Sequence, residues 1–171
     1  MVTLWTVFLS LHAASGVLGL LLGGFAFHPP QPRDFRQWVR RVYAAALVSM
    51  SVFLVATVLV DWSSINSTQH VVYSALIGLA AVILARLYLA FRVIARQPTD
   101  WIAKYVNHIY FTYVSLWEAF FIVGLIDLGA PAWVVGAVAV GVLILGATLV
   151  SRYKGRLQSQ PVGNQQQLEL G

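Results

Sequence analysis

Residues 4–27 read LWTVFLSLHAASGVLGLLLGGFAF, a stretch that contains no Asp, Glu, Lys or Arg. A helix needs about 20 apolar residues to cross the hydrocarbon core of a bilayer. No basic residue precedes the stretch, and it is longer than the apolar region of a typical secretory signal, about 7 to 15 residues. It therefore predicts a first membrane span that stays in the protein and ends before Pro29 and Pro30, which cannot continue a helix.

The chain as a whole has the same character. Its apolar residues make up 59% of the sequence and its charged residues only 10%, against about 25% charged residues in soluble proteins. We predict an all-α, polytopic membrane helix bundle of five transmembrane helices. The spans are expected at about residues 4–27, 38–60, 70–91, 101–128 and 131–150. Residues 1–157 then form the bundle, and the Gln-rich residues 158–171 form a polar tail.

The basic residues indicate the orientation of this bundle. With five alternating spans, every Lys and Arg falls on one side, whereas the two opposite loops carry only Asp61 and Asp127. The basic residues are Arg33, Arg36, Arg40, Arg41, Arg86, Arg92, Arg96, Lys104, Arg152, Lys154 and Arg156. Independent choices of side would give this result roughly once in a thousand trials, so the positive-inside rule predicts an outer N-terminus and a cytoplasmic C-terminus.

Composition also excludes several functions. The chain has no Cys, which rules out disulfides, thiol catalysis and thiolate metal sites. The net charge of +5 comes from short clusters beside the spans and does not indicate nucleic-acid binding. No HExxH, GxSxG, Walker or GxGxxG motif is present, so no catalytic residue is predicted. The expected partners are the lipid bilayer of a bacterial-type inner membrane and other membrane subunits or a second copy of the chain.

Ionisable residues inside a membrane are costly and are therefore candidates for function. Counted from the outer ends of their spans, His12 and Glu118 lie at similar depth, so we expect that they can meet. Such a pair would bind a proton, or a cationic or polar ligand; the alternative is a hydrogen bond that only fixes packing. Two oxygen and nitrogen ligands are too few for a typical zinc site, so no metal site is predicted.

Span four carries a polar stripe at helical spacing, formed by Tyr105, His108, Thr112 and Ser115, with Glu118 to one side. A polar stripe in a span faces protein or water and not lipid. It indicates either a polar cavity, with Ser115 and Thr112 as ligand-binding residues, or hydrogen bonds between helices.

Span one carries small residues that let helices approach closely, namely Ser15, Gly16, Gly19 and Gly23. A Gly beside an intramembrane His also leaves room for a flat macrocycle, so haem b is a possible cofactor with His12 or His108 as axial ligand. The four histidines do not form an obvious bis-His pair, because His70 lies at the outer rim and His28 sits beside prolines.

The segment Leu11-His12-Ala13-Ala14-Ser15-Gly16, followed by Arg40-Arg41-Val42-Tyr43, resembles a bacterial family of predicted membrane proteins of unknown function with an L-H-x-x-x-G opening. The resemblance covers roughly the first third of the chain. This sequence has Arg40 where the family pattern favours Gly, and Gln37 where a His often stands. The resemblance implies a membrane bundle and no established activity.

These observations predict a non-enzymatic protein. One hypothesis is an accessory subunit of a larger membrane complex, and another is a bundle that binds or transports a small molecule or protons through His12 and Glu118. The alternative from another class is a redox protein that binds haem b or a pigment.

Overall fold

The computed structural model describes residues 3–26, 34–64 and 67–158, and all regular structure in these residues is helical. The helices are α1 (Leu4–Ala26), α2 (Asp34–Asp61), α3 (Ser67–Arg96), α4 (Trp101–Asp127) and α5 (Ala132–Gln158). The prediction of an all-α fold is confirmed. Each helix matches a predicted span to within one residue or contains it, and α2, α3 and α5 extend beyond their spans through charged residues. The predicted tail after Gln158 lies outside the described residues.

Four of these helices are long and apolar enough to cross a membrane, at Leu4–Ala26, Gln37–Asp61, Gln69–Arg96 and Trp101–Leu125. In α5 the apolar part found among the described residues is shorter, Trp133–Gly146. The chain is therefore a helical membrane protein.

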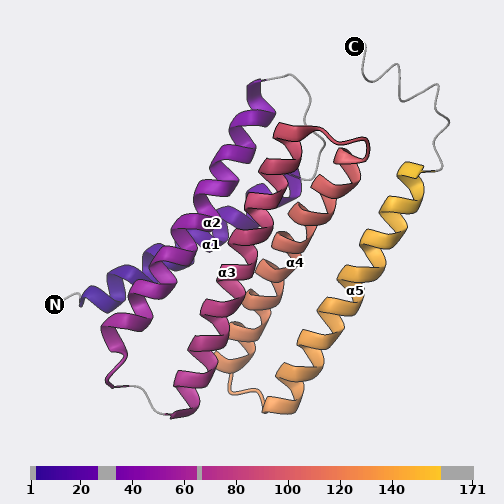
Figure 1. The fold of residues 1–171 in the computed structure, drawn as a ribbon. Helices are drawn as coiled ribbons and strands as arrows, with labels where there is room; N and C mark the ends of the chain where they lie inside the picture. Colours follow the sequence, from indigo (N-terminus) through magenta and orange to yellow (C-terminus); the bar gives the residue numbers. More distant parts are fainter. Residues whose placement is uncertain (1–2, 27–33, 65–66, 159–171) are drawn as a thin grey trace.

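The helices form a bundle in which α2, α3, α4 and α5 lie side by side, and α5 stands at the edge against α4 (Figure 1). Helix α1 is strongly tilted relative to the others and packs against α2 and α4. The α2–α3 and α4–α5 connections lie at one end of the bundle, and the α3–α4 connection lies at the other (Figure 1). This up-and-down arrangement is the one that alternating membrane spans require.

The α4–α5 turn shows how the sequence ends a span. Gly129 has φ +72°, and the amide of Ala130 donates to the carbonyl of Leu125 over 2.9 Å. This is a Schellman motif, in which Gly supplies the left-handed residue at low cost. Pro131 follows, and its carbonyl accepts from the amide of Val134 over 2.9 Å, so it caps the first turn of α5.

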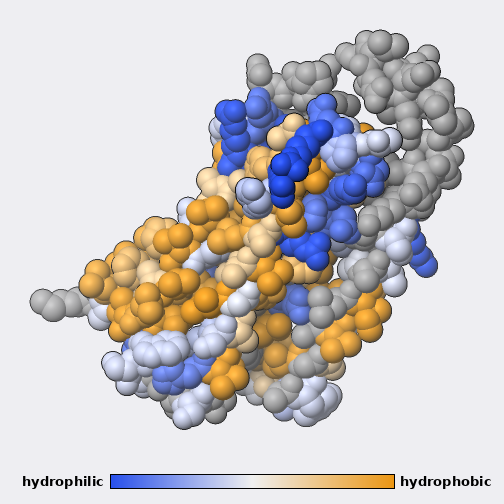
Figure 2. Space-filling model, viewed as in Figure 1, coloured by the Kyte–Doolittle hydropathy of each residue, from blue (hydrophilic) through white to orange (hydrophobic). Residues whose placement is uncertain are grey.

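Hydrophilic side chains gather at the end of the bundle where α3 meets α4, and apolar side chains cover its middle (Figure 2). The basic residues of the described chain lie in the parts of α2, α3, α4 and α5 nearest that end. Four helices therefore place their basic residues towards the same end of the bundle.

Two buried hydrogen bonds join the helices near that end. The hydroxyl of Tyr43 on α2 lies 2.9 Å from Oγ1 of Thr112 on α4. The hydroxyl of Tyr105 on α4 donates to the carbonyl of Ala26 in α1 over 2.8 Å. Around these bonds Leu47, Ile83 and other apolar side chains form the core.

Candidate functional site

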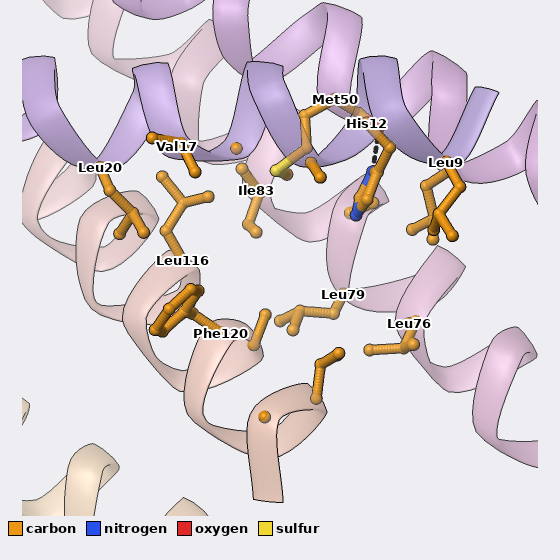
Figure 3. Close-up of a pocket in the computed structure, with 17 residues that line it drawn as sticks. Leu9, His12, Val17, Leu20, Met50, Leu76, Leu79, Ile83, Leu116 and Phe120 are labelled. Carbon is orange, nitrogen blue, oxygen red and sulfur yellow. Dashed lines mark hydrogen bonds between the residues drawn. The ribbon is translucent and has the colours of Figure 1, made fainter. Parts of the chain in front are cut away.

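A cavity of about 440 Å³ lies between α1, α2, α3 and α4, and we call it the lateral pocket. It is lined by Leu9, His12, Ala13, Gly16, Val17, Leu20, Met50, Leu54, Leu76, Leu79, Ala80, Ile83, Leu116, Ala119, Phe120, Val123 and Gly124. Its volume lies in the range of about 300–1,000 Å³ that is typical of small-molecule sites. Figure 3 shows that α3 and α4 supply an apolar wall opposite α1.

On one side, the pocket ends where α1 and α4 come into close contact. A Cβ atom added to Gly19 would lie 3.4 Å from Cδ1 of Leu116, and one added to Gly23 would overlap the ring of Tyr113. The two helices thus approach closely through the C-terminal half of α1. Towards the N-terminal half of α1, side chains of both helices line the pocket, which lies between them.

The mouth of the pocket is apolar. Val17 is 49% exposed, Phe120 54% and Val123 44%, and all three belong to the lining. In a bilayer, side chains of this kind at mid-helix contact lipid tails. The pocket therefore opens on the outer surface of the bundle through apolar side chains.

Among the lining residues, His12 is the one with strongly polar side-chain atoms; the sulfur of Met50 is only weakly polar. Its Nδ1 atom lies 2.8 Å from the main-chain carbonyl oxygen of Met50 on α2. The ring projects from α1 into the cavity, towards the wall that carries Leu79 (Figure 3). The hydrogen bond to Met50 fixes the ring, and the second ring nitrogen, Nε2, is the one directed into the space.

The structure does not bring His12 and Glu118 together. Glu118 is not among the residues that line the pocket with His12, and the polar contact of the His12 ring is with the main-chain carbonyl of Met50. Glu118 also lies about 200° around α4 from Leu116, away from the pocket. Its side chain is buried, with 9% exposure, and among the described residues no hydrogen bond or ion pair to it is found.

Thr112 and Ser115 are buried in α4 and do not line the pocket. Thr112 Oγ1 donates to the carbonyl of Ile109 over 2.7 Å and pairs with Tyr43, so its polar atoms are engaged in packing. Of the polar stripe, Tyr105 and Thr112 thus form hydrogen bonds between helices. The predicted binding role of Ser115 and Glu118 stays a prediction.

The small residues of α1 lie in different surroundings. Gly19 and Gly23 are buried against α4, whereas a Cβ on Gly16 would lie at an ordinary 3.6 Å from Sδ of Met50. Ser15 is half-buried. Gly16 lines the pocket one turn from His12, which keeps the space beside the imidazole open.

Among the described residues, no second histidine joins His12 at the pocket to form a pair for haem. His12 lines the pocket from α1, whereas His108 on α4 is not among the lining residues. His70 packs edge-on against Trp62 with ring centroids 4.4 Å apart. His28 lies outside the described residues. Within the residues that the structure describes, no group of three His, Asp or Glu side chains is placed to hold a metal ion.

Sequence reasoning identified His12 and missed most of what surrounds it. The wall formed by Leu76, Leu79 and Ile83 consists of ordinary apolar span residues. The partner of the imidazole is a main-chain carbonyl, which every residue has. The one usable signal was the spacing of His12 and Gly16 on a single face of span one.

No protein-family model matches this chain, and neither a curated protein nor a solved structure is found to be similar to it. The resemblance of the first third to the family with the L-H-x-x-x-G opening therefore stays a prediction.

Proposed function

We propose that this protein binds an apolar small molecule, which enters the lateral pocket from the bilayer and is held by a polar contact with His12. The observation that carries the proposal is a fixed imidazole in an otherwise apolar cavity whose mouth is formed by exposed apolar side chains. Apolar walls with a few placed polar groups are the usual composition of small-molecule sites.

The proposal includes the full predicted topology. The bundle crosses a bacterial-type inner membrane five times, with α5 as the fifth span, the N-terminus outside and the C-terminus in the cytoplasm. The position of the basic residues at one end of the bundle supports this orientation. In it, the pocket belongs to the outer half of the membrane.

The binding test uses an apolar aryl diazirine, which partitions into the membrane and forms a carbene on illumination. In membranes that contain the full chain, we expect labelling of the pocket lining that saturates with reagent and is suppressed by unlabelled apolar competitors. Side chains that simply face lipid are labelled in proportion to reagent, without saturation. Labelling that never saturates at any lining residue would refute the binding function.

A matched pair of variants sharpens this test. Gly124 lies at the pocket, and Gly78 lies on α3 outside the lining; a Cβ on either would meet no atom within 4 Å. Gly124→Phe should reduce saturable labelling at least tenfold by filling the mouth. Gly78→Phe should leave it unchanged, because it adds the same side chain away from the cavity.

Haem b is a second candidate for the same pocket, and one observation favours it. A His that ligates a metal usually donates its other ring N–H to a carbonyl or carboxylate, as His12 does to Met50. The test is the absorption spectrum, oxidised and dithionite-reduced, of protein purified in mild detergent from its own membranes. A Soret band lost in His12→Ala would identify haem, and a featureless spectrum would exclude it. No feature of the described residues favours the accessory-subunit hypothesis over these two.

A further inference from the structure

The tautomer of His12 follows from its partner. A carbonyl oxygen accepts hydrogen bonds and cannot donate, so the 2.8 Å contact with the carbonyl of Met50 requires the proton to be on Nδ1. In a neutral imidazole one ring nitrogen carries the proton and the other is a bare acceptor. Nε2 of His12 is therefore an acceptor, and it points into the lateral pocket (Figure 3).

The remaining lining offers little polar chemistry. Apart from His12, the lining side chains are Gly, Ala, Val, Leu, Ile, Phe and Met, with no hydroxyl, amide or charged group. The backbone around them belongs to α1, α2, α3 and α4, where helical hydrogen bonds occupy it. A polar ligand group in the cavity thus meets an acceptor and has no side-chain donor.

We propose that the ligand of the lateral pocket is an apolar alcohol or phenol, whose hydroxyl donates a hydrogen bond to Nε2 of His12, and that the corresponding ketone is rejected. This inference rests on the proposed binding function and specifies its ligand class. A ketone oxygen would face the Nε2 lone pair and would lose its hydrogen bonds to water or headgroups without replacement.

The size of the expected preference follows from the cost of that mismatch. Leaving a buried acceptor without a partner weakens an interaction roughly 10- to 100-fold, and sites built to bind a hydroxyl reject analogues that lack one. A hydrocarbon of the same skeleton should bind more weakly than the alcohol and at least as tightly as the ketone. It leaves Nε2 unpaired but buries no polar atom of its own.

The experiment uses menthol, menthone and menthane as competitors of diazirine labelling at pH 8. These probes share one carbon skeleton and differ only at the oxygen. We expect menthol to compete at least tenfold better than menthone in the natural protein, and the two to compete equally in His12→Leu. Met50→Leu is the matched control, because it changes the pocket wall but keeps the carbonyl that orients His12, and it should keep the preference.

The outcomes separate the two proposals. Equal competition by menthol and menthone in the natural protein would overturn the alcohol preference and leave the binding function standing. Competition by none of the three, together with labelling that does not saturate, would overturn both.

A direct measurement covers the case in which His12→Leu fails to fold. Magic-angle-spinning NMR of the full chain in lipid, with ¹⁵N-labelled histidine, distinguishes protonated from bare ring nitrogens. We expect His12 to show Nδ1–H and a bare Nε2, and the Nε2 signal to shift on addition of menthol but not of menthone. A protonated Nε2 would overturn the inference without any variant.

Discussion

The hydroxyl of Tyr105 donates a hydrogen bond to the main-chain carbonyl of Ala26, 2.8 Å away and buried in the interior. Ala26 is the last residue of α1, and the final carbonyls of a helix have no partner within it. A side chain of α4 thus satisfies the open end of α1. Together with the glycine contacts, this bond holds the C-terminal half of α1 against α4, and the lateral pocket lies beyond these contacts, between α1, α2, α3 and α4.

Tyr105→Phe is expected to destabilise the protein by about 1–2 kcal/mol, because it leaves the buried carbonyl of Ala26 without a donor. The free energy of unfolding can be measured by denaturant titration in mixed micelles. Tyr88→Phe is the control: Tyr88 is 65% exposed on α3, so this variant should keep the free energy of unfolding of the natural protein. Equal stability of the two variants would show that the bond does not hold α1.

The pair of Tyr43 and Thr112 should be energetically coupled. Thr112 gives its proton to the carbonyl of Ile109, so Tyr43 must be the donor of the 2.9 Å bond between the two hydroxyls. A double-mutant cycle with Tyr43→Phe and Thr112→Val should give a coupling of about 1 kcal/mol, in the range known for bonds between membrane helices. Additive effects of the two substitutions would contradict the assignment.

Gly23→Ala should destabilise the bundle by about 1–3 kcal/mol, because its Cβ would overlap the ring of Tyr113 and push α1 from α4. Gly16→Ala is the matched control, since its Cβ meets only the flexible Met50 side chain at 3.6 Å. Thermal unfolding in detergent measures both. If Gly16→Ala proved as costly as Gly23→Ala, the approach of the two helices would not be set where the structure places it.

The fold was largely predictable, since the apolar stretches determine the helices and charged or Pro-containing segments separate them. The pairing of His12 with Glu118 was not. Depth along a span follows from helical rise only if the spans start level and run parallel, and α1 is strongly tilted relative to the other helices. The direction of Glu118 around α4 depends on which face packs against α1, which is a property of the tertiary structure.

Topology can be tested with introduced cysteines, because the chain has none of its own. Leu128→Cys in the exposed α4–α5 turn should react with a membrane-impermeant maleimide in intact cells. Thr99→Cys in the α3–α4 turn and Ser151→Cys near the end of α5 should react only after permeabilisation. Reaction of Ser151→Cys in intact cells, with Thr99→Cys still protected, would show that α5 does not cross the membrane.

Glu118 should be a residue that the fold does not need. Its carboxyl is buried in α4, and no hydrogen bond or ion pair to it is found among the described residues, so its burial costs free energy that nothing in them offsets. Glu118→Leu is therefore expected to raise the free energy of unfolding by about 1–3 kcal/mol, as replacing poorly satisfied buried charges often does.

A second substitution at Glu118 separates the effect of the shape of its side chain from the effect of its charge. Glu118→Gln keeps the size and the polarity, so it should change stability less than Glu118→Leu, and Ser115→Ala one turn away should be close to neutral. Saturable diazirine labelling of the lateral pocket should persist in all three variants, because Glu118 faces away from it. A marked loss of stability in Glu118→Leu would mean that the carboxyl binds a structural partner, whereas loss of pocket labelling would mean that it acts on the pocket through α4.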